Sequence, residues 1–400
     1  MRRIAIIAAA LVTLAAHRAD AFPELTIRDE SARCTMCHIS PGGGGMLTGY
    51  GRDASAGLLS RGGHGTFLSG AWDPPAWLLL GGDLRAAALA YDDTGATEGV
   101  QLAAFPMQAD LRAGVQAGPI SIVVTGGLRG STRLYSKSAT NYVQSSEHYV
   151  MWTGESGAYV RAGKFFPMQG LRLPDHTLYV ARYTGLDLFE QPYGAEAGYV
   201  GDSWELHAAG FVHDPIVDVG RRDSGGVVYA EAHGDRWAVG AQGRFGTGDE
   251  GTRALGGMTA RLRGPGELVL LGEADVIHDQ IAGSTGVNRG VGLLGADERL
   301  ARGVSLFGWY EQYQEELGLS SALHQETGLA HHRHPRRRVY SERARQGRVR
   351  SRCPRDPRCE LRAVSHDVRG GLAQELHRAR HLDFGERRQR HVRTDDRGRA

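Results

Sequence analysis

The chain has 400 residues, enough for two or three ordinary domains or for one large barrel. Its formal net charge of +2 hides a split: the last 70 residues hold 21 arginines and 9 acidic residues, whereas the first 330 hold 26 basic and 36 acidic residues. Because the positive charge belongs to one C-terminal segment, we expect no nucleic-acid partner, and no apolar stretch after residue 21 is long enough for a transmembrane helix.

Residues 1–21 have the three parts of a secretory signal peptide. Arg2 and Arg3 form a positive start, Ile4 to Ala16 is apolar, and Ala19-Asp20-Ala21 is an A-x-A cleavage site. The apolar part is too short for a membrane span, so a retained anchor is the less favoured alternative. The pattern predicts an exported protein whose mature chain begins at Phe22.

A C-x-x-C-H motif, the attachment signature of c-type haem, follows at Cys34-Thr35-Met36-Cys37-His38. Two thiols at this spacing can add to the two vinyl groups of one porphyrin, and the histidine can ligate the iron. A zinc knuckle would need further ligands, and no other cysteine occurs before Cys353. A thioredoxin-like pair would need a βαβ context. The motif predicts one covalent haem c at Cys34 and Cys37, with His38 as the proximal axial ligand and no other metal.

Residues 22–76 form the predicted haem-binding segment. The four-glycine run Gly42 to Gly45 suits either close backbone approach to a flat cofactor or a flexible loop. Met46 and His64 are both candidate sixth ligands, and a five-coordinate or water-bound iron is the third option. The segment is short for a self-contained cytochrome, so we expect the haem to pack against the rest of the chain. The paired prolines Pro74 and Pro75 mark its end.

Residues 77–313 show the period-two alternation of β-strands. In the stretch from Trp204 to Ala208, for example, Trp204, Leu206 and Ala208 alternate with Glu205 and His207. The segments are about 9–11 residues long, their charges share the inward face, and aromatic residues gather near their ends, all typical of a membrane barrel. A soluble β-sandwich is the alternative. We predict a transmembrane antiparallel β-barrel of about 14–16 strands, in contact with outer-membrane lipid.

One long insertion interrupts the strands from Gly163 to Glu190. It mixes prolines with charged side chains, so it either folds inward to narrow the lumen or forms an ordinary surface loop. The loop is slightly favoured. The candidate lumen residues in and beside it are Lys164, Arg172, Asp175, His176 and Arg182.

The alternation fades after Tyr313, and Gln314 to Ala330 is expected to be a loop or short helix. From His331 the composition becomes Arg-rich, with only two aromatic residues. A barrel should end on an aromatic-rich strand, so we interpret residues 314–400 as an anomalous tail, with a frameshift preferred over a basic binding arm.

The motifs together resemble a group of exported proteins, mainly delta-proteobacterial and myxobacterial, that carry a short mono-haem c-type segment ahead of an outer-membrane barrel. The matching residues are Arg33 to His38, Pro41 to Gly44, Tyr50 to Arg52, Gly163 to Phe165 and Gly170 to His176. The resemblance covers roughly residues 22–313 and does not fix a substrate. It implies covalent haem at Cys34 and Cys37, ligated by His38. The tail departs from the pattern, which puts barrel closure in doubt.

These features favour an electron-transfer protein of the outer membrane. Its haem segment would lie in the periplasm and exchange electrons with a periplasmic donor or acceptor. The alternative is a porin-like channel in which the haem is structural, a plug or a sensor. An enzyme is not expected. A small peroxidase, with His64 as a faint distal candidate, is the third interpretation.

Overall fold

The computed structural model describes residues 23–28, 33–58, 74–92, 100–129, 143–173, 178–187, 190–215, 222–249, 251–281, 283, 285–301, 304–319 and 323–333. The chain divides into two compact units, Met1–Arg337 and Arg338–Ala400, and every described residue belongs to the first. The predicted signal peptide and most of the Arg-rich tail therefore lie outside the described residues.

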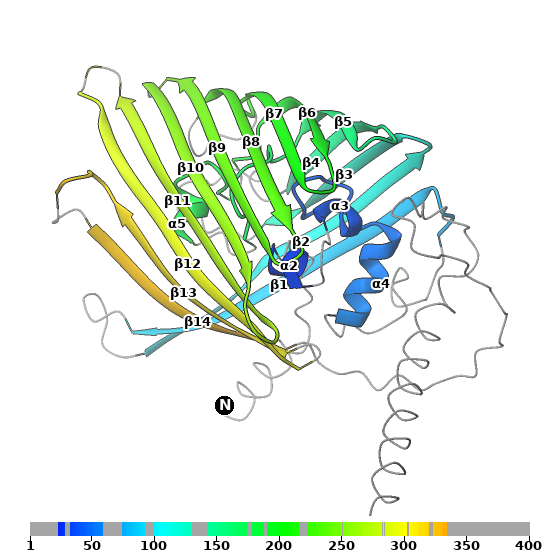
Figure 1. Cartoon of the computed structure of the whole chain (residues 1–400), viewed down its shortest axis with the longest axis horizontal. Helices are drawn as coiled ribbons and strands as arrows, with labels where there is room; N and C mark the ends of the chain where they lie inside the picture. Colours follow the sequence, from blue (N-terminus) through cyan, green and yellow to red (C-terminus); the bar gives the residue numbers. More distant parts are fainter. Residues whose placement is uncertain are drawn as a thin grey trace, which may run out of the picture. The chain divides into compact units, whose positions relative to one another are not determined.

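Fourteen antiparallel strands form one sheet in simple chain order (Figure 1). They are β1 (Leu78–Asp92), β2 (Val100–Ala117), β3 (Ile120–Arg129), β4 (Val143–Thr153), β5 (Ala158–Lys164), β6 (Tyr193–Val200), β7 (Trp204–Val212), β8 (Ser224–Gly234), β9 (Trp237–Gly248), β10 (Gly251–Arg263), β11 (Leu268–Ile281), β12 (Val287–Ala301), β13 (Val304–Gln314) and β14 (Leu323–Arg333). The predicted mainly-β fold is confirmed. Several strands are longer than expected: β2 has 18 residues.

The last strand differs from the prediction. β14 pairs along its whole length with β13, Gln314 opposite Leu323 and Val304 opposite Arg333, where a loop or short helix was expected. Its sequence has no alternation to reveal a strand. A polar segment forms one here because the free edge of β13 offers a row of backbone hydrogen-bonding groups. The boundary predicted at residue 313 therefore lies one hairpin too early.

The distribution of apolar and charged side chains on the sheet is the reverse of that in a soluble protein. In β7 the apolar Leu206 is about half exposed, whereas Glu205 and His207 on the opposite face are buried. The same alternation holds in β11, where Leu270 and Val276 are exposed and Asp275 is buried. Apolar side chains facing out and charged side chains facing in are what lipid outside and a polar lumen inside require. The sheet is thus the wall of a transmembrane barrel.

The two ends of the wall differ. One end has tight connections, such as residues 118–119, 201–203 and 235–236, and the other has longer ones, such as 165–192 and 213–223. Four exposed tryptophans, Trp77, Trp152, Trp204 and Trp237, all stand at the short-turn end. Tryptophan collects at the membrane–water interface, so this row confirms the expected aromatic girdle at that end.

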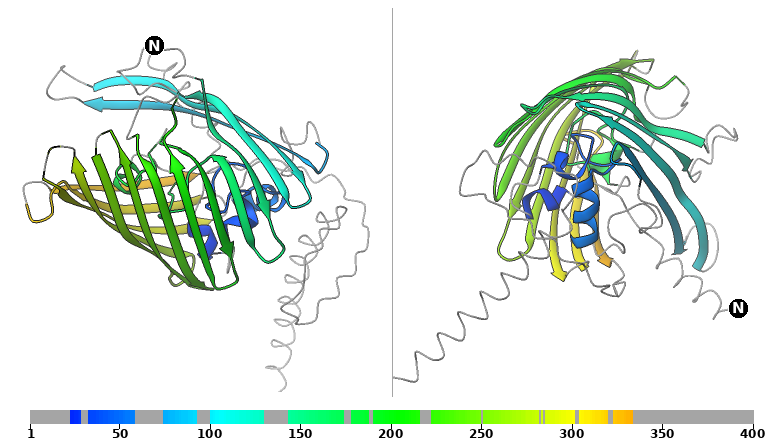
Figure 2. Two further views of the ribbon diagram at one scale, coloured as in Figure 1. Left: turned by 90° about the horizontal axis from the view of Figure 1, so that it is seen from above. Right: turned by 90° about the vertical axis from the view of Figure 1, so that its right-hand side faces the viewer.

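The described residues include four short helices beside the sheet: α2 (Pro23–Arg28), α3 (Cys34–Cys37), α4 (Gly49–Leu58) and α5 (Tyr179–Arg182). Figure 2 shows them on the concave side of the sheet. No helix in the described part of the chain is long and apolar enough to cross a membrane. Helix α2 contacts β10 and β11, and α5 contacts β11, β12 and β13.

Two apolar patches interrupt the polar inner face, and each is covered by one of these inward segments. Ile39 and Met46 of the N-terminal segment pack on a patch that includes Leu79, Val123 and Tyr149. In the second patch, Leu171, Leu178 and Val180 of the insertion cover the inward apolar residues of β11, β12 and β13. These wall residues are Val269, Leu271, Val291, Leu293 and Tyr313. Where the N-terminal segment and the insertion cover these patches, their apolar side chains are buried together with those of the wall. The burial of this apolar surface anchors both segments to the wall.

Candidate functional site

The C-x-x-C-H motif forms a single helical turn. The His38 N–H donates to the Cys34 carbonyl at 2.8 Å, which closes α3. Cys34 and Cys37 stand at positions i and i+3, so both side chains lie on one face of that turn. Cys34 and Cys37 are half-buried residues, while His38 is buried. A one-turn helix thus presents two thiols and an adjoining imidazole.

Thr48 ties this turn to α4. Its hydroxyl donates to the Met36 carbonyl at 2.6 Å and accepts from the Gly51 N–H at 3.0 Å, so it caps α4 at the same time. The Thr48 N–H donates to the Cys37 carbonyl at 3.0 Å. An isolated bridge between His38 and Leu47 completes the connection. The motif is therefore held by the residues that follow it and not by a separate cytochrome domain.

The donor chemistry fits a c-type haem. Two thiols on one face of a turn, followed directly by an imidazole, match the two thioether bonds and the axial nitrogen that such a haem needs. Among the described residues, no group of three or more His, Cys, Asp or Glu side chains is placed to hold a metal ion. Met46 is buried in the first apolar patch, with its sulfur near Gly81 of β1, and its role as a sixth ligand stays a prediction. His64 lies outside the described residues.

The thiol of Cys34 lies in a low-dielectric position. Desolvation, together with the negative charges of Glu205 and Glu231, raises the pKa of Cys34 to about 12. The positive charges of Arg261 and Arg172 act in the opposite direction. The motif therefore faces the charged side chains of the inner wall.

This pKa predicts slow alkylation of Cys34 in folded, haem-free protein. Because the thiolate is the reactive form and the pKa is raised, the reactive fraction near pH 8 falls and recovers only as the pH approaches 12. We expect iodoacetamide to modify Cys34 at least about 100-fold more slowly in the native protein than in urea. Mass-spectrometric alkylation rates measure this, and equal rates in both states would contradict it.

The glycine run after the motif packs against the wall. Gly43, Gly44 and Gly45 all have positive φ, between 60° and 73°. A Cβ on Gly42 would lie 2.9 Å from the Met168 sulfur, and one on Gly45 would overlap the Glu147 carboxylate. Of the two predicted roles, a flexible loop does not describe this packed turn, and the close approach is to protein side chains.

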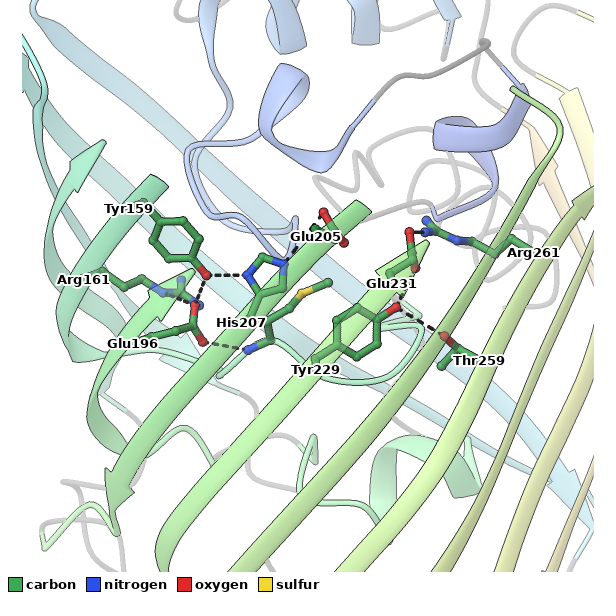
Figure 3. A network of polar contacts seen from close by, with 10 residues as sticks. Tyr159, Arg161, Glu196, Glu205, His207, Tyr229, Glu231, Thr259 and Arg261 are labelled. Atoms are coloured by element: carbon green, nitrogen blue, oxygen red, sulfur yellow. Dashed lines mark hydrogen bonds and ion pairs between the residues drawn. The ribbon is translucent and has the colours of Figure 1, made fainter. Parts of the chain in front are cut away.

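A buried polar network faces this segment (Figure 3). Arg161 of β5 binds Glu196 of β6 through Nε at 2.9 Å and reaches the Ser40 hydroxyl at 3.1 Å. The Tyr159 hydroxyl donates to Glu196 at 2.7 Å and lies 2.7 Å from Nδ1 of His207 on β7. The N-terminal segment is thus joined to three neighbouring strands.

The network continues along the wall. The Tyr229 hydroxyl of β8 donates to Glu231 at 2.6 Å and lies 3.2 Å from the Thr259 hydroxyl of β10. Arg261 pairs with Glu231 (Figure 3). Arg261 also donates to the hydroxyl of Thr26 of α2 at 2.7 Å. At the far end of α2, Arg28 forms a buried ion pair with Asp297 of β12.

Glycines on the intervening strands make both bridges possible. A Cβ on Gly198 would lie 2.6 Å from Tyr159 and 2.7 Å from His207 Nδ1. A Cβ on Gly240 would lie 2.5 Å from the hydroxyls of both Tyr229 and Thr259. The one sequence signal for these contacts is a glycine on the inward face of the middle strand. Because glycine has no side chain, residues of the two flanking strands can meet above it.

The insertion folds inward, contrary to the slight preference for a surface loop. The Leu171 N–H donates to Glu273 at 2.9 Å, and the Tyr179 N–H donates to Glu311 at 2.6 Å, so the insertion spans from β5 to β11 and β13. Its leucines and valine cover the second apolar patch, which a surface loop would leave in contact with water.

The predicted lumen residues lie in different environments. Lys164 is buried and paired with Asp214, Arg182 is exposed and lies over the Tyr183 ring, and Arg172 contacts the glycine run. Asp175 and His176 lie outside the described residues. The arrangement brings Arg172, the motif and the inner wall together. Sequence reasoning did not find Tyr159, Glu196, Tyr229, Glu231 or Thr259, because which inward residues meet depends on strand register.

Fold and site together define a transmembrane β-barrel wall that holds a C-x-x-C-H segment against its inner face. No family model matches the sequence, and no curated relative matches it. Among solved structures, the chain is similar to a loop-deletion mutant of OmpT from Vibrio cholerae, with a TM-score of 0.42 and 12% identity over 62% of this chain and 81% of that one. A triple-mutant porin of Rhodopseudomonas blastica gives a TM-score of 0.32 and 13% identity over 64% of this chain and 99% of the porin.

Proposed function

We propose that this protein is a haem c-binding electron-transfer protein of the outer membrane, with one redox centre held inside the periplasmic mouth of its barrel. The observation that supports this most directly is the position of Cys34, Cys37 and His38 on one short turn against the inner wall. A covalently held haem there would supply an iron that cycles between two oxidation states, and His38 would bind it from one side.

The orientation follows from the connections of the sheet. Outer-membrane barrels have short periplasmic turns and longer extracellular loops. The N-terminal segment enters β1 at the short-turn end, and Arg33 pairs with Asp202 in the 201–203 turn at that same end. This orientation supports the proposal, because a haem bound at the motif would be accessible to a soluble periplasmic electron donor or acceptor.

A haem stain of the outer-membrane fraction tests the proposal. Wild type is expected to give a covalent haem band, Cys34→Ala to lose most of it, and Thr35→Ala, which keeps the motif, to retain it. A wild-type fraction without a haem band would overturn the proposal. Reduced-minus-oxidised spectra, followed by electron exchange with a reduced periplasmic protein fraction, then test the redox role.

The porin-like alternative has its own supporting observation. Two segments lie on the inner face, residues 23–28 with 33–58 and the described part of the insertion. The first is held by the buried ion pair of Arg28 with Asp297 and by the hydrogen bond from Arg161 to Ser40, which could be broken to release it. In that case the haem segment is a plug. Conduction in planar bilayers by a protein whose haem never exchanges electrons would favour this function over the first.

Removing the buried pair of α2 is expected to open the barrel. The side chains of Arg28 and Asp297 are each only 2% exposed, so Arg28→Ala leaves a buried carboxylate unpaired, at a cost of roughly 3–5 kcal/mol to the docking of α2. The Arg33 and Asp202 pair is largely exposed, so Arg33→Ala is the control and should cost under about 1 kcal/mol. Planar-bilayer recordings should show larger or more frequent conductance for Arg28→Ala only. Equal conductance in both variants would contradict the prediction.

A further inference from the structure

Arg172 is held in an unusual conformation beside the haem motif. Its φ of 50° is the one positive φ of a non-glycine residue among the described residues. Such backbone is costly for a residue with a side chain and is found where the surroundings impose it. Here the preceding Leu171 N–H is fixed to Glu273, and Gly170 is also left-handed, at 62°. The hydrogen bond to the wall thus fixes the backbone before Arg172 and, with it, the direction in which the Arg172 side chain points.

The guanidinium reaches the loop that follows His38. A Cβ on Gly42 would overlap Nη1 and lie 3.2 Å from Cζ, and one on Gly44 would lie 3.7 Å from Nη2. Arg172 is also one of the two arginines whose charge acts on the Cys34 sulfur. The cation therefore lies beside the glycine loop that follows the motif, and its charge acts on the first cysteine of the motif.

This guanidinium forms no ion pair within the described part of the chain, although the charges of Glu147 and Glu196 act on it from farther away. Nη1 is buried and makes no hydrogen bond, and Arg172 forms no ion pair with any other described residue. Its recorded side-chain contact is with the Phe166 ring, at 5.9 Å. The two neighbouring arginines differ, because Arg161 is bound by Glu196 and Arg261 by Glu231. Burial and the charge of Arg161 lower the pKa of Arg172, and the charges of Glu147 and Glu196 offset this only in part, so an anion in direct contact would be favourable there.

We propose that Arg172 binds a propionate carboxylate of the haem attached at Cys34 and Cys37. The inference rests on the proposed haem function. A porphyrin of this type carries two propionates, and a guanidinium pairs with a carboxylate through two parallel hydrogen bonds. The insertion then has a specific role. It carries a haem-binding residue from β5 across the lumen and fixes it on β11, so haem attachment and insertion packing depend on each other.

Binding of haem in the absence of the thioether bonds provides the test. The full-length Cys34→Ala/Cys37→Ala protein, in detergent, is titrated with hemin and separately with hemin dimethyl ester, whose propionates carry no charge. Arg172→Gln in this background should weaken hemin binding roughly 10- to 100-fold and leave the affinity for the ester unchanged. Arg172→Lys should recover part of the loss, and Arg236→Gln, on an exposed turn, should change neither affinity.

The ester is the control for folding, because a misfolded pocket would lose both ligands. Equal losses for hemin and its ester, or no loss for either, would overturn the inference. The proposed function is judged separately, by the covalent haem band of the wild type. A wild type with that band and an Arg172→Gln variant with unchanged hemin affinity would reject the role of Arg172 alone.

Discussion

Arg161→Met is expected to lower the free energy of unfolding by about 3–5 kcal/mol, one of the largest single-site losses in this chain. The side chains of Arg161 and Glu196 are 0% and 1% exposed, so the variant leaves a carboxylate buried without its cation. The loss extends beyond one ion pair. Arg161 also donates to Ser40 and to the Phe166 carbonyl, and it lies 3.9 Å from the centre of the Phe165 ring. The same substitution therefore loosens the N-terminal segment.

Two further variants isolate the charge effect. Arg161→Met/Glu196→Gln removes both charges and should recover much of the stability, because a neutral buried pair carries no ionic desolvation cost. Arg299→Met breaks a pair with Glu267 whose side chains are 21% and 40% exposed, and should cost under about 1 kcal/mol. Urea unfolding in detergent measures all three. A double variant no more stable than Arg161→Met would contradict the argument, as would an Arg299→Met loss of the same size.

The sequence predicted the wall and the inward direction of its charges. Period two placed Arg161 and His207 on the inner face, and both are buried there. It could not predict that Tyr159 would meet His207, two strands away, because that contact depends on register and on the absence of a side chain at Gly198. Periodicity states which face a residue occupies and leaves open what it meets on that face.

The insertion and β14 show two other limits. The insertion has prolines and charges, which are typical of surface loops, but its Leu171, Leu178 and Val180 match the inward apolar residues of β11 and β12. The run Leu268 to Leu271 is apolar on both faces, and this is a sequence signal that something covers the inner one. β14 has no such signal, since a strand added to an edge is paired through its backbone.

The C-x-x-C-H motif can be located from the sequence alone, because it is defined by residue identity and spacing, and its assignment to haem stays a prediction. The structural elements that hold the motif could not be located in this way. The cap at Thr48 and the contact of Gly51 with the motif depend on how α4 folds back over α3, which neither propensity nor spacing specifies. The motif was expected to need a neighbour, and the neighbour is both the barrel wall and this ten-residue helix.

Gly51→Ala is expected to destabilise the haem segment, although the same change normally strengthens a helix. Alanine in a helix interior is favoured over glycine by about 1 kcal/mol. Here a Cβ would lie 2.8 Å from the Cys37 Cα and 2.7 Å from its carbonyl carbon, and these are backbone atoms that cannot rotate away. Helix α4 would have to move off α3, with a net loss of at least about 2 kcal/mol from the segment.

Gly49→Ala provides the matched control in the same helix. Gly49 is exposed and has open space where the Cβ would go, so its substitution should be neutral or slightly stabilising. Hydrogen exchange should show lost protection of the Thr48 amide in Gly51→Ala alone, because this amide donates to the Cys37 carbonyl across the contact between α3 and α4. The haem band should fall with it, since a displaced turn no longer holds two thiols and His38 in one arrangement. Protection equal to that of Gly49→Ala would show that α4 is not what supports the motif.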